Sequence, residues 1–404
     1  MKTVDVAIVG GGIVGCVLAK GLSEQAGLNV TLIDASDPHT SETINPLHDK
    51  RVIALAKRTV DELTALGVPL AELAKQHPGI IEQIEVSDKG HAGLTDLHCK
   101  DYGLSSFGQV VSLGALTSLV VEGQQQYTHL SGVTVSKVTR LKSHVSLSLS
   151  NNDVIDAKLL VVADGGHSPI TEWVGISRQT KSYNQTALIF NVHTQQRHQN
   201  RAYERFTSQG PLAFLPFDNE IEGVASKGNG FSVVWTLAHD EAQRIAMQPA
   251  NACIPLLQET FGYRAGRITH ISDIASYPLQ LCTCDTVTSH RVVVVGNAAQ
   301  ALHPIAGQGF NLGMRDIAAL VEVLKGESDA GAFSCTQRYE NVRKHDRAAT
   351  IGLTDRLVHT FSNQHLPLVV GRNLSLLALN AVSQAKQAFV RQATGFAKHQ
   401  RSGQ

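Results

Sequence analysis

A glycine-rich turn near the N-terminus has the spacing of a dinucleotide-binding loop. Gly10 directly follows the expected strand 4–9, Gly12 and Gly15 come two and five residues after Gly10, and Asp34 stands 19 residues after Gly15. In such a loop the first glycine permits a tight turn, the second lets the backbone approach a pyrophosphate, and the third lets the helix pack closely on the sheet. The helix N-terminus attracts the pyrophosphate, and the distal acid accepts hydrogen bonds from ribose hydroxyls. The motif predicts a dinucleotide site without separating FAD from NAD.

Two later turns favour FAD. Asp164-Gly165 ends the apolar run 159–163, where the plainer alternative is a turn capped by an acidic residue. Gly296-Asn297 ends another apolar run, and a loop rich in proline and glycine follows. Asn297 can hydrogen-bond the ribityl chain of a flavin, and N–H groups near residues 307–311 can stabilise negative charge on the reduced ring. The candidate cofactor contacts in the three motifs are Gly10, Gly12, Gly15, Asp34, Asp164, Gly165, Gly296, Asn297, Pro304, Gly307, Gly309 and Asn311.

The elements that must position these turns alternate between strand and helix. Residues 4–9, 13–25 and 29–34 are predicted to form a β-α-β unit, and a strand is expected at 80–86. Three short strands precede the apolar run at 159, and strands separated by glycine turns fill most of 183–278. Further helices are expected at 51–66, 113–127, 242–260, 312–324, 336–361 and 367–396.

The expected fold class is α/β, with a Rossmann-like FAD-binding domain, an inserted and mostly antiparallel β-sheet substrate domain, and a helical C-terminus. Residues 1–182 and 279–325 are assigned to the two parts of the FAD-binding domain. Residues 183–278 are assigned to the substrate-binding sheet, and residues 326–404 to the C-terminal helices.

Charge and cysteine content argue against several classes of protein. Lys plus Arg and Asp plus Glu both number 35, so the formal net charge is zero, and nucleic-acid binding is not expected. Only Cys282 and Cys284 are close in sequence, and no further ligands at metal-binding spacing accompany them, so no metal is expected. No run of about 20 apolar residues predicts a membrane span. The N-terminal residues do not form a secretion signal, because Asp5 and three consecutive glycines interrupt the apolar segment that such a signal needs. A cytoplasmic protein is therefore expected.

Several long segments of the sequence resemble the class A FAD-dependent monooxygenases of the para-hydroxybenzoate hydroxylase type. Within that group it is similar to the 2-polyprenyl-6-methoxyphenol hydroxylases of ubiquinone biosynthesis. The resemblance implies FAD as cofactor, NAD(P)H and O2 as co-substrates, and hydroxylation of an electron-rich phenol ring with a polyprenyl tail. The stretches that carry it are 51–68, 86–93, 202–216, 276–279, 296–316 and 349–363.

The resemblance also assigns roles to single residues. Arg51 stands where relatives use an arginine to reach the FAD pyrophosphate, with an exposed helix-start arginine as the alternative. Gln109 is a further candidate contact to FAD. His303, beside the expected flavin ring, could shuttle a proton, although many loop histidines have no chemical role. Asn297 replaces the aspartate of relatives, and Thr171 replaces an arginine after the Asp-Gly motif, which leaves the binding of the reductant open.

No nucleophile triad is recognisable and no catalytic residue is assigned, because in this chemistry the flavin performs the difficult step. Four aromatic residues of the inserted sheet could line a substrate pocket, although aromatic residues in strands more often belong to the core: Phe206, Phe214, Phe217 and Trp235. The apolar stretch 366–382 could pack on the protein or contact a membrane or another ubiquinone-biosynthesis protein.

Two other functions fit the same motifs. One is a flavin-linked reductase or oxidase, and the other is a non-catalytic flavoprotein subunit of a biosynthetic assembly. Phenol-stimulated NAD(P)H oxidation with oxygen incorporation would favour the hydroxylase. Reduction without oxygen use would favour the reductase, and no turnover with any reductant would favour the subunit.

Overall fold

The computed structural model describes residues 2–36, 51–76, 79–91, 93–122 and 126–361, together with residues 387, 390, 391, 394 and 395. The helix predicted at 367–396 therefore lies almost wholly outside the described residues. The long helices are α1 (Ile13–Glu24), α2 (Lys57–Ala65), α3 (Leu70–Gln76), α4 (Leu113–Val121), α6 (His239–Ala246), α7 (Ile254–Phe261), α8 (Gln308–Leu324) and α9 (Phe333–Phe361). The short helical segments are η2 (Cys99–Tyr102), α5 (Ile170–Trp173), η3 (Ala250–Cys253), η4 (Gly296–Ala298) and η5 (Ile305–Gly307).

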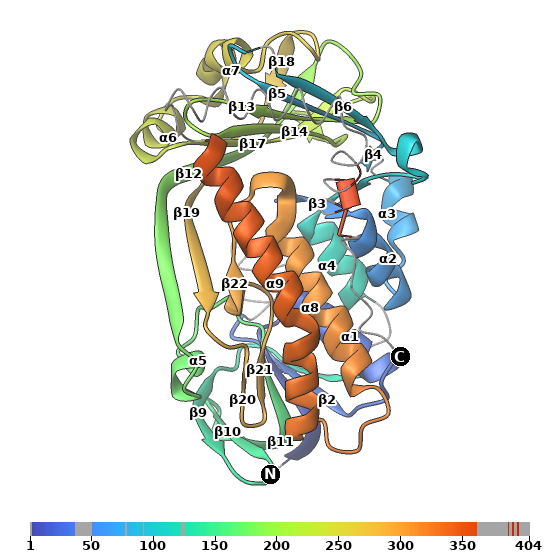
Figure 1. Ribbon diagram of the computed structural model, residues 1–404, viewed down its shortest axis with the longest axis vertical. Coiled ribbons are helices and arrows are strands. Elements are labelled where there is room, and N and C mark those ends of the chain that lie inside the picture. The colour runs from blue at the N-terminus through green and yellow to red at the C-terminus, as the bar shows by residue number, and fades with distance from the viewer. Residues whose placement is uncertain are drawn as a thin grey trace.

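The first layer is a parallel β-sheet with strand order β20-β21-β11-β1-β2-β8 (Figure 1). The pairs from β21 to β8 are parallel, and an antiparallel hairpin, β9 with β10, attaches to β11. The apolar run at 159 and the short strand expected before it form one strand, β11. The strands are β1 (Lys2–Val9), β2 (Val30–Ile33), β8 (Thr128–Leu130), β9 (Val135–Arg140), β10 (Val145–Leu149), β11 (Val154–Val162), β20 (Thr288–Ser289) and β21 (Val292–Val294).

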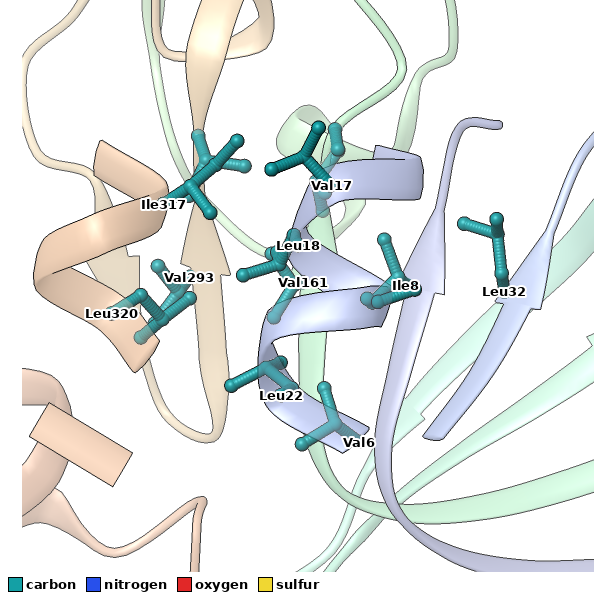
Figure 2. Close-up of a cluster of buried hydrophobic side chains, with 14 of the residues drawn as sticks. Val6, Ile8, Val17, Leu18, Leu22, Leu32, Val161, Val293, Ile317 and Leu320 are labelled. Carbon is teal, nitrogen blue, oxygen red and sulfur yellow. The ribbon is translucent and has the colours of Figure 1, made fainter. Parts of the chain in front are cut away.

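The main core lies between this sheet and the helices α1 and α8. Helix α1 contacts the sheet, α4 and α8, so most of its circumference is buried. Figure 2 shows the apolar side chains of the sheet and of the two helices gathered in this interface: Val6, Ile8, Val17, Leu18, Leu22, Leu32, Val161, Val293, Ile317 and Leu320. Each such side chain contributes about 1.5–3 kcal/mol when fully buried, so this interface is the main source of stability for the first layer.

The second layer is a mostly antiparallel sheet with strand order β22-β19-β12-β17-β14-β13-β5-β6, and β18 also pairs with β12. Two long strands, β12 and β19, pair along their length and run from the first layer to the second (Figure 1). The strands are β5 (Gln83–Asp88), β6 (Leu94–His98), β12 (Arg178–Thr194), β13 (Arg201–Phe206), β14 (Pro211–Pro216), β17 (Gly230–Ala238), β18 (Ile268–Ile271), β19 (Ala275–Cys284) and β22 (Gln300–Ala301). A separate two-stranded ribbon joins β15 (Glu220–Ile221) to β16 (Val224–Ala225).

The hairpin of β5 and β6 differs from the sequence expectation. The domain division placed everything up to residue 182 in the FAD-binding part, but β5 pairs in parallel with β13 and extends the second sheet. Sequence patterns describe a strand's own alternation and not its partner, so this long-range pairing could not be read from the chain.

Residues 52–56 form a strand instead of the first turns of the helix expected at 51–66. Strand β3 (Val52–Ala56) pairs with β7 (Gly108–Ser112), which also pairs with β4 (Ile80–Ile81), and α2 begins only at Lys57. Apolar residues with β-branched side chains favour the paired, pleated backbone, and tertiary pairing overrides a helical period of this length.

Two expected helices are shorter than predicted. The helix expected at 242–260 is divided into α6, η3 and α7, with Pro249 before η3 and Pro255 in the first turn of α7. Proline lacks an N–H group and cannot continue a helix, but it is tolerated in a first turn. The helix expected at 113–127 ends at Val121, and β8 begins at Thr128.

Candidate functional site

The predicted motifs meet at one edge of the parallel sheet. The first follows β1, Asp34 follows β2, Asp164 follows β11 and Gly296 follows β21, and these strands are neighbours with the same direction. The carboxyl ends of parallel strands are where ligands bind in open α/β sheets. Motifs separated by up to about three quarters of the chain are therefore brought together by strand order.

A cavity of 1390 Å³ extends from this edge to the second sheet. Its volume exceeds the range of about 300–1,000 Å³ for ordinary ligand pockets, so it has room for a large cofactor and a substrate. The predicted site residues that line it are Gly10, Gly12, Asp34, Arg51, Asp164, Gly165, Gly296, Asn297, Pro304, Gly307, Gly309 and Asn311. Gly15 and Gln109 are not among the residues lining it.

The glycines of the first motif have different environments. Gly10 has φ +111°, and a Cβ there would lie 2.5 Å from the carbonyl oxygen of Ala163. A Cβ on Gly15 would lie 1.9 Å from the carbonyl oxygen of Gly10, so this glycine allows α1 to approach the turn. A Cβ on Gly12 would meet nothing within 4 Å and would point into open space. Gly12 is also the N-cap of α1, whose first turn carries no acidic residue, so the position suits a phosphate group.

Asp34 lies beside the first motif at the end of β2. Its Oδ1 accepts a hydrogen bond from Ser36 N at 2.8 Å. Its Oδ2 is so close to Gly11 that a Cβ on Gly11 would lie 1.8 Å from it, which explains the glycine between Gly10 and Gly12. Burial, and secondarily the charge of Asp34, raise the pKa of the nearby Cys16 thiol to about 12, so Cys16 is an inert core residue.

Asp164 organises the second motif through hydrogen bonds within its own loop. Its carboxylate accepts from Gly166 N at 2.8 Å and from Ser168 N at 3.0 Å, and also from the Ser168 hydroxyl. The alternative of a turn capped by an acidic residue therefore describes its contacts, although the side chain also lines the cavity. Arg178, which belongs to no recognised motif, donates to Gly166 O at 2.7 Å and to Asn297 O at 3.3 Å. It connects the second motif to the third.

A buried carboxylate on α8 stabilises the third motif by accepting hydrogen bonds from the side of the turn that faces away from the cavity. Asp316 Oδ2 accepts from Gly296 N at 3.2 Å and from Gln300 Nε2 at 2.6 Å, while its Oδ1 accepts from Arg343 Nε at 2.8 Å. Arg347 on α9 donates to Gln300 Oε1 at 2.8 Å. With this support behind it, the turn leaves the Asn297 side chain exposed beside the cavity.

The start of α8 is fixed to β3 by Asn311. Its Nδ2 donates to Ala54 O at 2.9 Å and to Gly307 O at 2.6 Å, and its Oδ1 accepts from Ala56 N at 2.8 Å. The amide group is thus occupied by protein partners, so Asn311 positions the loop. Gly307, the N-cap of α8, has φ +61°, which favours glycine.

Arg51 and Gln109 lie differently with respect to the cavity. Arg51 lines it, and its guanidinium carbon lies 5.8 Å from the centre of the Tyr277 ring, a cation–π contact. Gln109 is buried in β7, and its Nε2 has no hydrogen-bond partner among the described residues. A direct contact between Gln109 and FAD stays a prediction.

His303 is fully buried and does not line the cavity. Its Nδ1 accepts a hydrogen bond from Ile305 N at 3.1 Å, and its ring lies edge-on to that of Tyr183, with centroids 5.3 Å apart. Burial lowers the pKa of this imidazole to about 4, so it is neutral near pH 7. These contacts support the alternative of a loop histidine without a proton-shuttle role.

The face of the second sheet that closes the cavity is almost entirely apolar. The side chains on it are mainly Ile84, Val86, Ile189, Ala202, Ala213, Leu215 and Val234. Glu204 lies among them, and burial raises the pKa of its carboxyl to about 7. None of the four aromatic candidates lines the cavity: Phe214 and Trp235 belong to the core on the opposite face, and Phe206 and Phe217 to other buried clusters.

Two further findings concern metals and membranes. Within the described ranges, no group of three or more His, Cys, Asp or Glu side chains is arranged to hold a metal ion. Cys282 and Cys284 are both buried, and neither forms a disulfide within the described ranges. Among the helices of the described part, none combines the length and the apolar character that a membrane span requires.

Comparison with known proteins gives matches along nearly the whole chain. The FAD binding domain family matches residues 3–350. The ubiquinone hydroxylase UbiL of Rhodospirillum rubrum is 32% identical over 98% of this chain and 91% of its own length. The 3-demethoxyubiquinol 3-hydroxylase of Escherichia coli is 28% identical over 97% of this chain and 98% of its own length. Klebsiella pneumoniae HpxO, solved with FAD and uric acid, shares the fold with a TM-score of 0.74 at 15% identity, covering 97% of this chain and 96% of that one.

Proposed function

The chain belongs to the FAD binding domain family, and we propose that it is an aromatic-ring monooxygenase that hydroxylates a polyprenylated phenol in ubiquinone biosynthesis. One observation carries the proposal: a single cavity joins the dinucleotide motif to an apolar sheet face that holds one carboxyl group. The names of the full-length relatives UbiL and 3-demethoxyubiquinol 3-hydroxylase support the pathway.

The motif residues fit an FAD molecule in this cavity. In the proposal, Gly10, Gly12 and the start of α1 receive the pyrophosphate, and Asp34 receives the adenosine ribose. The remaining candidate contacts at the ribityl chain, the pyrophosphate and the flavin ring are Arg51, Gln109, Asp164, Gly165, Gly296, Asn297, Pro304, Gly307, Gly309 and Asn311. Gly15 acts through the packing of α1. When bound, FAD supplies the activation of O2 for transfer of one oxygen atom to the ring, with NAD(P)H as reductant.

The protein's own contribution is orientation and exclusion of water. The apolar sheet face would hold the aromatic ring and keep water from the reacting centre. Its rows of aliphatic side chains suit a prenyl group equally well, because burying each methylene stabilises binding by about 0.8 kcal/mol. We propose that the substrate domain comprises residues 183–278 together with the hairpin of β5 and β6.

A polyprenylated substrate resides in a membrane. We propose that the protein works in the cytoplasm and collects its substrate at the inner face of the plasma membrane, or from another ubiquinone-biosynthesis protein. The predicted contact segment, 366–382, falls outside the described residues. Binding to phosphatidylglycerol vesicles with and without a quinone precursor, measured by flotation, would test this location.

The function is tested on the FAD-loaded protein with NADH or NADPH, isotopically labelled O2 and 2-prenylphenol. Phenol-stimulated NAD(P)H oxidation with one labelled oxygen in the product is the expected result. Reduction of the flavin without incorporation of oxygen would instead identify a reductase or oxidase. Absence of turnover with every reductant would favour a non-catalytic flavoprotein subunit.

A further inference from the structure

Glu204 stands in the middle of the apolar face. Strand pairing places it directly between Val86 on β5 and Ala213 on β14, and the same cross-strand row continues through Val234 on β17 to Ile189 on β12. All five side chains line the cavity. Four of them are apolar, and the neighbouring Ala213 is small, so a ring could lie flat on the row with a polar atom directed at the carboxyl.

Among the residues that the structure describes, no side chain forms a hydrogen bond or ion pair with the Glu204 carboxyl. The side chain is only partly exposed, and removal from water is the cause of its raised pKa, about 7. An unpaired carboxylate in an apolar setting is costly, whereas an aliphatic side chain at this position would complete the row. The fold itself therefore does not explain why a carboxyl group stands at this position. We take this to mean that the partner of the carboxyl is a ligand.

Few other charged groups face Glu204. On β5, Asp88 follows on the same face two residues after Val86, and β14 carries no titratable residue on this face. Tyr277 and Arg51 line the same cavity and contact each other. The arginines and the tyrosine of β13 alternate to the opposite face. From other elements, Tyr183 packs against the cluster of Val86 and Phe206 and donates a hydrogen bond to Asp355, and burial raises its pKa. Burial keeps the adjoining His303 neutral near pH 7, so Glu204 is the group among these whose pKa lies near 7.

The neighbours of Glu204 also contact the third motif. Ile305, from the loop expected beside the flavin, packs in one buried cluster with Val86 and Phe206. Val86 is the cross-strand partner of Glu204, and Phe206 is the next residue on its face of β13. A ring bound against Glu204 would therefore lie close to the loop that carries Pro304 and Gly307.

We infer that Glu204 is the catalytic group that receives the hydroxyl proton of the phenol substrate, an inference that rests on the proposed function. The phenol O–H bond breaks, its proton forms an O–H bond with the carboxylate, and the electron pair stays on the phenolate oxygen, which makes the ring more electron-rich. One atom of O2 is then added to the ring as a hydroxyl group, and the other atom leaves as water with the two electrons that NAD(P)H supplies. The ring oxygen takes the proton back from Glu204 while the hydroxylated carbon loses its own proton to water. The carboxylate is thereby restored.

The test compares Glu204→Gln with the wild type and with Glu220→Gln, the same change at an exposed position outside the cavity. All three proteins are FAD-loaded and receive 2-prenylphenol. We expect kcat to fall about 100- to 10,000-fold in Glu204→Gln, with a smaller change in KM. The rise of kcat/KM with pH through about 7 should disappear in that variant and persist in the control. A Glu204→Gln enzyme with wild-type kcat and pH profile would overturn the inference.

A binding measurement separates this inference from the proposed function. Titration calorimetry of 2-prenylphenol in two buffers gives the number of protons exchanged. The wild type should release protons on binding below about pH 7, and the release should vanish above it; Glu204→Gln should release none. Such linkage without oxygen insertion would refute the hydroxylase and leave the proton transfer between phenol and Glu204. Hydroxylation without proton release on binding would refute only the role of Glu204 and leave the proposed function intact. Because proton release is measured on the wild type, this outcome can be judged even if the variant does not fold.

Discussion

The three glycines of the first motif have different reasons to be glycine. Gly10 and Gly15 are required by the packing of the protein against itself, since a Cβ at either position would meet backbone atoms at 2.5 Å or less. Gly12 faces only open space. A side chain there is therefore harmful only if a ligand occupies that space, which makes Gly12 the informative position for the cofactor.

We predict that Gly12→Val and Asp34→Ala both weaken FAD binding. Valine would enter the space expected to hold the pyrophosphate, and alanine would lose hydrogen bonds to the ribose worth on the order of 1.5–3 kcal/mol. The measurement is the FAD dissociation constant by fluorescence quenching. Gly352→Val, another position with open space around its Cβ but away from the cavity, serves as control. Full FAD occupancy of both variants at low FAD concentration would show that the first motif is misassigned.

Substitutions of Asn297 test the third motif. Asn297→Asp keeps an acceptor and should still bind FAD, while its added negative charge should lower the flavin reduction potential modestly by repelling the reduced, negatively charged form. Asn297→Leu should reduce FAD affinity, because it removes the hydrogen bond and places an apolar group against a polyol. Dissociation constants and potentials of both variants are compared. Wild-type affinity in Asn297→Leu would mean that this side chain does not contact the cofactor.

His303 should make stability depend on pH. Its folded-state pKa, about 4, lies below the ordinary value of about 6.5, so between these values the unfolded chain binds a proton that the folded chain does not. Stability should therefore fall as pH decreases from about 6.5 to 4, by up to about 3 kcal/mol. His303→Asn retains an acceptor for Ile305 N and should lose less stability over this range than the wild type or the exposed-site control His91→Asn. The measurement is the melting temperature of the three proteins as a function of pH. An equal fall of the melting temperature in all three between about pH 6.5 and 4 would contradict this assignment.

At the scale of elements, α8 and α9 support the turn that follows β21. Asp316 on α8 links the turn to Arg343 on α9, and Arg343 and Arg315 both pair with Asp346. Burial alone would raise the pKa of Asp346, but these two arginines hold it below its ordinary value. The network is buried, so its charges depend on each other more than surface pairs do.

We predict that Asp316→Ala destabilises the protein by about 3–5 kcal/mol, because it removes a partner of the buried Arg343. It should also weaken FAD binding, since Gly296 N loses its acceptor and the turn is released. Urea denaturation and FAD titration measure the two effects. Glu327→Ala, which breaks a largely exposed pair with Arg338, should change little in either assay. Equal effects of the two substitutions would show that the network does not position the turn.

At the scale of the whole molecule, the cavity wall comes from both sheets. The β12–β19 ribbon and the β22 strand of the third motif connect them, so a cofactor in the cavity would contact elements of both layers. FAD at 100 times its dissociation constant should stabilise the fold by about 2.7 kcal/mol. Hydrogen exchange should slow in the loops after β1, β11 and β21 and also in β13 and β14. Protection confined to the first sheet would show that the second sheet does not enclose the site.

The sequence alone determined the local parts of this protein. The β-α-β unit, the glycine spacing and Asp34 depend on neighbouring residues, so they could be predicted, and the fold class and the monooxygenase family were confirmed. The apolar runs that end in Asp164 and Gly296 could be recognised as strand ends for the same reason. Glu204 could also have been recognised, because it shares one face of the strand 202–206 with the apolar residues Ala202 and Phe206. A charged residue on an otherwise apolar strand face is the signal that the sequence analysis missed.

The tertiary structure decided what depends on long-range pairing. Strand order brought the motifs together, pairing made residues 52–56 a strand, and sheet register turned Glu204 toward the cavity and Phe214 away from it. Arg178 became a bridge between two motifs only through the path of β12. The physical reason is that a strand's own sequence fixes which side chains share a face, whereas the partner strand and the register decide what that face contacts.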